Sequence, residues 1–232
     1  TDAEFETKQE RKNIKSLVEL VKNIADDYSV HVMLVPTKTW TLQQKLPFCA
    51  STYDEQKMYD SLNEQLGNLA DSVVVPVQET LCSHREEDIY YRTDHHWTTL
   101  AGFEAAKEIL DYCNYSLGYD FDLSLLSSDR YCYTKYNECW LGETGKKVSG
   151  TWAKVLDDFT FIEPNFETDV SYVVDSATIN RRGEFSDCFI DKSVLEEAKN
   201  YYNAKSWHYS YLFSNYDYCE LTNNCKVDGK NI

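Results

Sequence analysis

The sequence predicts an α/β fold in which helices flank a parallel sheet. Two short apolar runs, residues 30–35 and 72–75, each end at a proline, and an amphipathic segment precedes each run. Because helices that alternate with strands make right-handed crossovers, the two strands should pair in parallel, with ligands bound at their carboxyl ends. A length of 232 residues fits one large domain, and we expect residues 1–232 to form a single domain.

The predicted elements follow one another in order. Residues 8–27 carry apolar side chains at helical spacing after a polar start, which predicts an amphipathic helix. The run VHVMLV at 30–35 predicts a buried strand that leads into a loop at the next proline. Residues 54–70 predict a second helix, the run SVVV at 72–75 a second strand, and residues 98–112 a third helix.

The pattern weakens after the third helix. Residues 113–215 mix Tyr, Asp, Ser, Asn and Gly with short strand-like pieces such as Val170–Val174. We therefore expect this region to be an irregular insertion or subdomain.

The composition narrows the classes of partner. The net charge of −16 would be repelled by phosphate backbones and anionic lipids, so nucleic acid is not expected as a partner. Aromatic residues make up 14% of the chain, which suits surfaces that stack on sugars, although a Tyr-rich core explains the same value. No apolar run approaches the ~20 residues of a membrane span. No basic-then-apolar signal peptide opens the sequence, but it begins at Thr1 rather than Met, so this excludes neither a leader nor an anchor.

The eight cysteines favour an oxidising compartment. They show no CxxC or Cys/His spacing of a metal site, so disulfides are the natural interpretation, with buried free thiols as the alternative. Cys132 with Cys139 and Cys219 with Cys225 are the expected bridges. We therefore expect an extracytoplasmic protein, secreted or membrane-anchored.

The segment YYRTDHHWT, residues 90–98, is the most informative part of the sequence. An aspartate two residues before a histidine can accept a ring N–H of that histidine and leave its other nitrogen free as a base. Asp94 and His96 stand in this relation. Trp97 and Tyr91 would wall the pair from water, and Thr98 is placed to cap the next helix.

The segment has two other interpretations. An isolated Asp-His pair can be a purely structural hydrogen bond near a helix start. A metal site would draw on Asp94, His95, His96 and His84, but adjacent histidines point apart in an extended chain. We therefore expect no metal.

The segment also resembles the signature of the DHHW proteins, in the alginate O-acetyltransferase-like branch of the SGNH hydrolase superfamily. The positions that match its pattern are Tyr90, Thr93, Asp94, His96, Trp97 and Gly102. Residues 34–47, LVPTKTWTLQQKLP, resemble the family's strand, proline and loop. The resemblance implies a flavodoxin-like three-layer fold with a parallel sheet, in which Asp94 orients His96 as general base for a serine nucleophile.

In this branch the serine follows the motif, on an apolar strand that ends in Asp-Ser after a Gly-Lys turn. The chain ends at residues 228–232, DGKNI, so the expectation is a chain truncated before the strand that carries the nucleophile. Ser176, after the apolar Tyr172–Val174, is the internal candidate and departs from the family's pattern. Asn215 lies in a segment that resembles the family's Phe-Gly-Gly-Asn but lacks both glycines.

The resemblance implies an extracytoplasmic carbohydrate O-acetyltransferase or acetylesterase that works through a Ser-His-Asp acyl-enzyme. No metal or organic cofactor is implied. The implied partners are a polysaccharide or other glycan and a membrane-bound O-acyltransferase that delivers the acetyl group. The alternatives are a non-catalytic glycan-binding or exopolysaccharide-assembly protein on the same fold, and a secreted disulfide-rich interaction domain with a fortuitous match.

Overall fold

A computed structural model gives the fold as two compact units. One unit comprises Thr1–Ile89 and Phe103–Leu117, and the other comprises Tyr90–Gly102 and Gly118–Ile232. The structure describes residues 8–50, 53–69, 72–148, 150–174, 179–188, 193 and 220–225. The expectation that residues 1–232 form a single domain stays a prediction.

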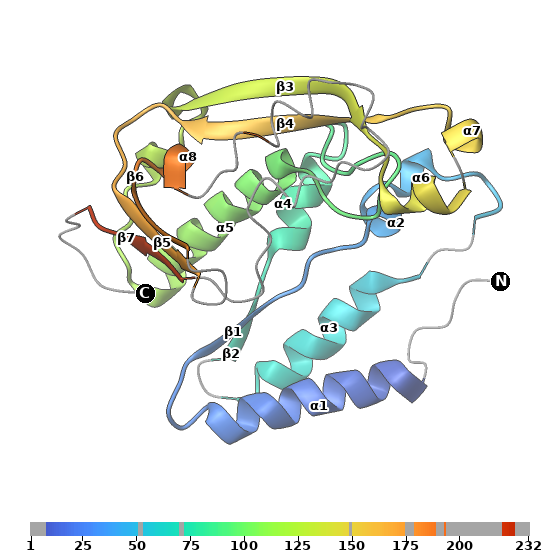
Figure 1. Cartoon of the computed structure of the whole chain (residues 1–232). Helices are drawn as coiled ribbons and strands as arrows, with labels where there is room; N and C mark the ends of the chain where they lie inside the picture. Colours follow the sequence, from blue (N-terminus) through green and yellow to red (C-terminus); the bar gives the residue numbers. More distant parts are fainter. Residues whose placement is uncertain are drawn as a thin grey trace. The chain divides into compact units, whose positions relative to one another are not determined.

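The first unit contains the helices and strands predicted for the first half of the chain (Figure 1). Its elements are α1 (Lys8–Ile24), β1 (Val30–Met33), α2 (Lys38–Thr41), η1 (Gln43–Lys45), α3 (Glu55–Leu66), β2 (Ser72–Val75), α4 (Val77–Ser83) and most of α5 (Thr99–Leu117). The three predicted helices correspond to α1, α3 and α5, which confirms them.

The two apolar runs pair as a parallel ladder. Val30 lies opposite Ser72 and Met33 lies opposite Val75, so the predicted parallel pairing of β1 with β2 is confirmed. Among the described residues β1 and β2 form a sheet of two strands. The wider three-layer sheet therefore stays a prediction, as does the position of Asp94 and His96 at its carboxyl edge.

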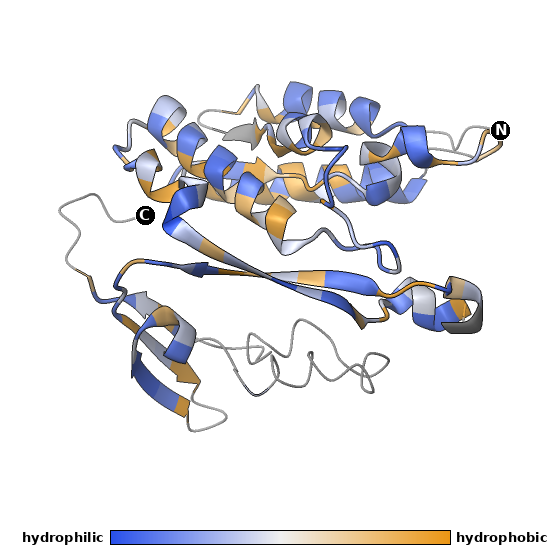
Figure 2. Ribbon diagram, turned by 90° about the horizontal axis from the view of Figure 1, so that it is seen from above, coloured by the Kyte–Doolittle hydropathy of each residue, from blue (hydrophilic) through white to orange (hydrophobic). Residues whose placement is uncertain are grey.

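Helices α1 and α3 bury one face each, as their amphipathic patterns predict. The helices in Figure 2 carry hydrophobic and hydrophilic residues side by side along their length. The buried side chains of the core that they share are Ile14, Val18, Val21, Tyr59, Leu62 and Leu66. Within the part of the chain that the structure describes, no helix has both the length and the apolar character needed to cross a membrane.

The second unit is mainly antiparallel. Strands β3 (Tyr131–Trp140) and β4 (Asp157–Pro164) form a long hairpin, and β5 (Val170–Val174) lies between β6 (Ile179–Gly183) and β7 (Glu220–Asn223) (Figure 1). The short helices are η2 (Leu123–Leu126), η3 (Ser128–Arg130), α6 (Glu143–Val148), α7 (Gly150–Ala153) and α8 (Phe185–Cys188).

The described residues of this unit form strands that the sequence pattern does not indicate, and the expectation of an irregular insertion at residues 113–215 stays a prediction. Strand β5 buries every second residue, and β3 leaves most of its residues exposed. Strands of this kind need no continuous apolar run, because one face meets water. In sequence, the polar residues of such strands therefore look like those of loops.

The expected bridge between Cys132 and Cys139 is wrong. Both cysteines lie on the single strand β3, and both have free thiols. Seven steps along a strand span about 20 Å, whereas a disulfide holds its Cα atoms within about 7 Å. Cys225 also has a free thiol, and its expected partner, Cys219, lies outside the described residues.

Cysteine alkylation should follow burial. Cys49, Cys132 and Cys225 are exposed and should react in the native protein. Cys139 should react only after unfolding, because burial raises the pKa of its thiol to about 12 and the thiolate is the reactive form. Mass spectrometry after alkylation, with and without denaturant and without reductant, measures both groups. A mass that requires Cys132 or Cys139 to be disulfide-bonded would contradict this structure.

Candidate active site

The motif segment forms a closed loop in the second unit. Tyr90 and Trp97 make an isolated antiparallel bridge, and the backbone N–H of Tyr91 donates to the carbonyl of His96 at 3.3 Å. Thr98 Oγ1 accepts the N–H of Ala101 at 3.4 Å, which agrees with its predicted role as a helix cap. The loop thus begins and ends at fixed points, and Asp94 lies between them.

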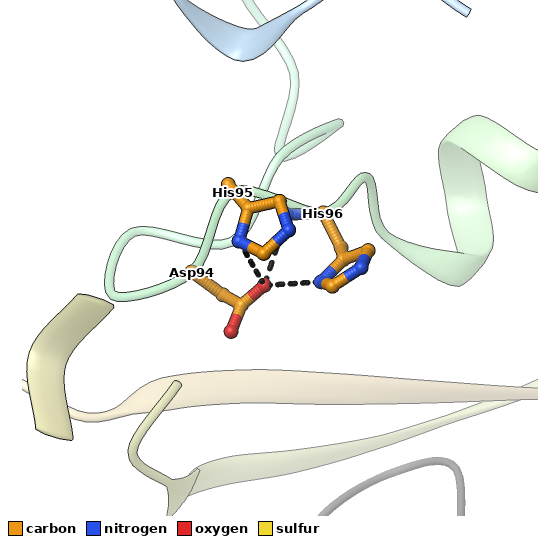
Figure 3. A group of neighbouring side chains, drawn as sticks. All are labelled: Asp94, His95 and His96. Carbon is orange, nitrogen blue, oxygen red and sulfur yellow. Dashed lines mark hydrogen bonds and ion pairs between the residues drawn. The ribbon is translucent and has the colours of Figure 1, made fainter. Parts of the chain in front are cut away.

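Asp94 and His96 are joined directly (Figure 3). Asp94 is 1% exposed, and its Oδ1 lies 2.5 Å from His96 Nδ1 and accepts the backbone N–H of His96 at 2.9 Å. Asp94 Oδ2 accepts the N–H of Glu143, at the start of α6, at 2.6 Å. Because an ionised carboxylate has no hydrogen to donate, Nδ1 of His96 must carry it. Nε2 is then the basic nitrogen of His96.

The surroundings of Asp94 keep it ionised. Burial by itself raises the pKa of this carboxyl group. The backbone N–H groups of Glu143 and His96, together with the ring of His96, outweigh burial and lower the pKa of Asp94 below its ordinary value. The imidazole therefore faces a carboxylate, which holds its tautomer.

A second buried acid, Asp157 at the start of β4, anchors the loop by hydrogen bonds. Its Oδ1 accepts the N–H of Arg92 at 2.5 Å, and its Oδ2 accepts the N–H of Thr93 at 2.8 Å and the hydroxyl of Thr93. Thr93 Oγ1 in turn accepts the N–H of Gly142 at 2.7 Å, and its carbonyl accepts the N–H of Gly145 at 2.8 Å. The residue before Asp94 is thereby fixed on both sides.

Replacing Asp157 by asparagine should destabilise the protein by about 1–3 kcal/mol. The amide nitrogen of an asparagine cannot accept the hydrogen bonds of Arg92 or Thr93, so buried donors would lose their partner. Urea unfolding measures the change. Asp158→Asn is the matched control, since the side chain of Asp158 is 30% exposed, and its loss should cost less. Equal losses in the two variants would contradict a special role for Asp157.

The other predicted site residues have different placements. Tyr91 is 2% exposed, with its ring edge-on to Trp140 at a centroid distance of 4.9 Å, and Trp97 is half-buried. Ser176 and Asn215 lie outside the described residues. The roles of these four residues stay predictions.

A protein-family model described as "SGNH hydrolase-like domain, acetyltransferase AlgX" matches residues 1–117, which include the loop with Asp94 and His96. No curated protein is significantly similar to the chain in sequence.

Three solved structures resemble this one. The O-acetyltransferase domain of Pseudomonas putida AlgJ is 13% identical, with a TM-score of 0.53 over 70% of this chain and 61% of that chain. A DHHW family protein from Eubacterium siraeum is 20% identical, with a TM-score of 0.62 over 92% of this chain and 64% of that one. Bacillus cereus PatB1 is 18% identical, with a TM-score of 0.59 over 97% of this chain and 71% of that one.

At these identities the likeness shows the fold alone. The chain spans 61% of the AlgJ domain and 64% of the DHHW protein.

Proposed function

Because the chain belongs to the family of SGNH hydrolase-like, AlgX acetyltransferase domains, we propose that it serves in carbohydrate O-acetylation. The observation that carries the proposal is the hydrogen bond between a buried Asp94 and His96 Nδ1. His96 is 45% exposed at its side chain, so a hydroxyl group from outside the loop has access to the imidazole. This arrangement suits a general base rather than a purely structural contact.

The proposed reaction has two steps. In the first, a serine Oγ attacks the carbonyl carbon of an acetyl donor while His96 Nε2 takes the hydroxyl proton, and the donor's leaving group then departs with that proton. In the second, His96 Nε2 takes the proton of a sugar hydroxyl, whose oxygen attacks the acetyl-serine, and this proton passes to the serine Oγ as the bond between that oxygen and the acetyl group breaks. Water in place of the sugar gives acetate, which is the esterase reaction. Asp94 stays ionised throughout.

The serine itself is part of the proposal. The family's pattern favours a serine that these 232 residues do not contain, and Ser176, two positions after the end of β5, is the internal candidate. Asn215 is proposed to bind the substrate or to form part of the site wall. Trp97 and Tyr91 are the proposed walls of the site.

We further propose an extracytoplasmic site of action, a glycan acceptor and a membrane-bound O-acyltransferase as acetyl source. The family match supports the glycan acceptor and the extracytoplasmic site, whereas the membrane-bound partner rests on the resemblance of the motif alone. The free thiols of Cys132, Cys139 and Cys225 remove the support expected from disulfides. We also propose that the fold has the three layers of the family, with a parallel sheet flanked by helices.

Covalent labelling tests the mechanism. One solved form of PatB1 carries a sulfonyl adduct, so an aryl sulfonyl fluoride is a suitable reagent for the serine. We expect one serine to be sulfonylated, and peptide mapping identifies it. Labelling of Ser176 makes that residue the nucleophile. If this chain is not labelled, the complete protein encoded by the gene is treated in the same way, and failure there favours the non-catalytic glycan-binding alternative.

A further inference from the structure

His95 and His96 lie side by side, contrary to the expectation that adjacent histidines diverge. Their ring centroids are 3.9 Å apart with 37° between the ring planes. That expectation assumed an extended chain, whereas the bridge between Tyr90 and Trp97 closes residues 91–96 into a loop. Figure 3 shows both rings turned toward the same oxygen of Asp94.

The donor atoms of the three side chains are close enough to share one ion. His95 Nδ1 lies 3.6 Å from Asp94 Oδ1, and His96 Nδ1 lies 2.5 Å from the same oxygen. One ligand atom from each of the three residues lies within 4.8 Å of the other two. In a tetrahedral zinc site, with bonds near 2 Å, such atoms stand about 3.3 Å apart. The side chains would need shifts of about 1 Å, which two exposed imidazoles can make.

Glu143 lies beside the three-residue group and becomes a fourth ligand if its side chain turns toward the ion. Its Oε2 lies 3.7 Å from His95 Nδ1, while its Oε1 is held by Lys147 Nζ at 2.8 Å. The backbone N–H of Glu143 also orients the carboxylate of Asp94, in the way that outer hydrogen bonds orient metal ligands. The carboxylate of Asp94 thus comes from the loop, and that of Glu143 comes from α6.

We propose that Asp94, His95, His96 and Glu143 bind one divalent transition-metal ion of the zinc class. Two imidazoles with two carboxylates suit zinc, copper or nickel, whereas magnesium and calcium prefer oxygen ligands alone and more of them. The site uses the base of the proposed reaction, and its second residue, His95, has no part in that reaction.

The bound ion would prevent His96 from acting as a general base. This consequence rests on the proposed function. A metal bound to Nδ1 of His96 replaces the hydrogen shared with Asp94, and the neutral imidazole then carries its hydrogen on Nε2. Nε2 can no longer accept a proton from a hydroxyl group. The metal is therefore an inhibitor of acyl transfer and not a cofactor for it.

Histidine nitrogen spectra test the binding. The chain has five histidines, so long-range ¹H–¹⁵N spectra of the ¹⁵N-histidine-labelled chain can follow each ring, assigned by single substitutions. Exposed thiols are alkylated first, because thiolates also bind zinc. One equivalent of zinc chloride should shift the Nδ1 signals of His95 and His96. The control is His84, whose Nδ1 contacts Glu87 at 2.8 Å and whose Nε2 lies 3.9 Å from Glu104. Among the described residues His84 belongs to no three-residue metal group, and its signal should not shift.

His95→Ala should weaken zinc binding, measured by calorimetry, by about a hundredfold, since even the loss of an outer partner of a ligand costs about 10- to 100-fold. His95 is 61% exposed at its side chain, so the fold should tolerate the change, and circular dichroism checks this. Unmoved His95 and His96 signals, or equal zinc affinity in the variant, would overturn the proposal.

Serine labelling tests the inhibition separately. Zinc should slow sulfonylation of the complete protein at least about tenfold, a chelator should restore it, and zinc should not slow it in His95→Ala. Sulfonylation at full rate with zinc bound would overturn the inhibitory role. If no serine is labelled even without zinc, the proposed function fails, and the spectra still decide the metal site.

Discussion

His96→Ala should lower acetyl-ester turnover by the complete protein by roughly 10⁴- to 10⁶-fold, the range found when a single member of a serine triad is removed. Without the imidazole, an unassisted serine hydroxyl is a poor nucleophile at neutral pH. His96 Nδ1 meets the buried Asp94 Oδ1 at 2.5 Å, whereas the neighbouring His95 Nδ1 lies 3.6 Å from the same oxygen. The measurement is kcat/KM on a chromogenic acetyl ester.

Asp94→Asn should cost about 10⁴-fold, because the amide no longer selects the tautomer with hydrogen on Nδ1. The double variant should be no worse than His96→Ala alone, since the two residues act as one unit. His84→Ala is the control: His84 Nδ1 also contacts a carboxylate, that of Glu87 at 2.8 Å, and the substitution should leave kcat/KM unchanged. Wild-type turnover by His96→Ala would remove His96 from the mechanism.

The sequence could predict the elements whose signal is local. The apolar runs at residues 30–35 and 72–75 indicate their strands directly, as the amphipathic spacing indicates the helices, although Val30–Val32 are half-buried and Met33 is exposed rather than fully buried. Strand β3 could not be predicted in this way, because most of its residues are exposed and its partner β4 begins 17 residues after it ends. Strand β3 forms because it pairs with β4, which is distant in the sequence. Such pairing produces no recognisable pattern in the local composition.

The same distinction holds for the site. Asp94 and His96 are two residues apart, so their spacing and the family's motif were enough to predict the hydrogen bond between them. Asp157 contacts Thr93 across 64 residues, and Glu143 contacts Asp94 across 49. The sequence around an acidic residue at the start of a strand does not indicate which distant loop that residue will bind. The apposition of His95 and His96 was missed because it depends on closure of the loop rather than on residue spacing.

Gly142 shows how closely the two halves of the site approach. A Cβ at this position would lie 2.5 Å from the Cβ of Asp94 and 2.6 Å from the backbone oxygen of Thr93. Backbone cannot yield as the end of a flexible side chain can. The N–H of Gly142 also donates to Thr93 Oγ1 at 2.7 Å, and the next N–H, that of Glu143, donates to Asp94. The absence of a side chain is therefore a condition for both hydrogen bonds.

Gly142→Ala should accordingly displace Asp94 and cost about 1–3 kcal/mol or more of stability, with a fall in turnover of about a hundredfold for each ångström of misplacement. Urea unfolding and kcat/KM on the acetyl ester measure the two effects. Gly102→Ala is the matched control, because a Cβ there meets nothing within 4 Å. Gly102 lies within α5, so alanine should stabilise the protein by up to about 1 kcal/mol. The contrast between the two glycines is the decisive result: if Gly142→Ala is as stable and active as Gly102→Ala, the loop and the start of α6 do not meet as this structure has them.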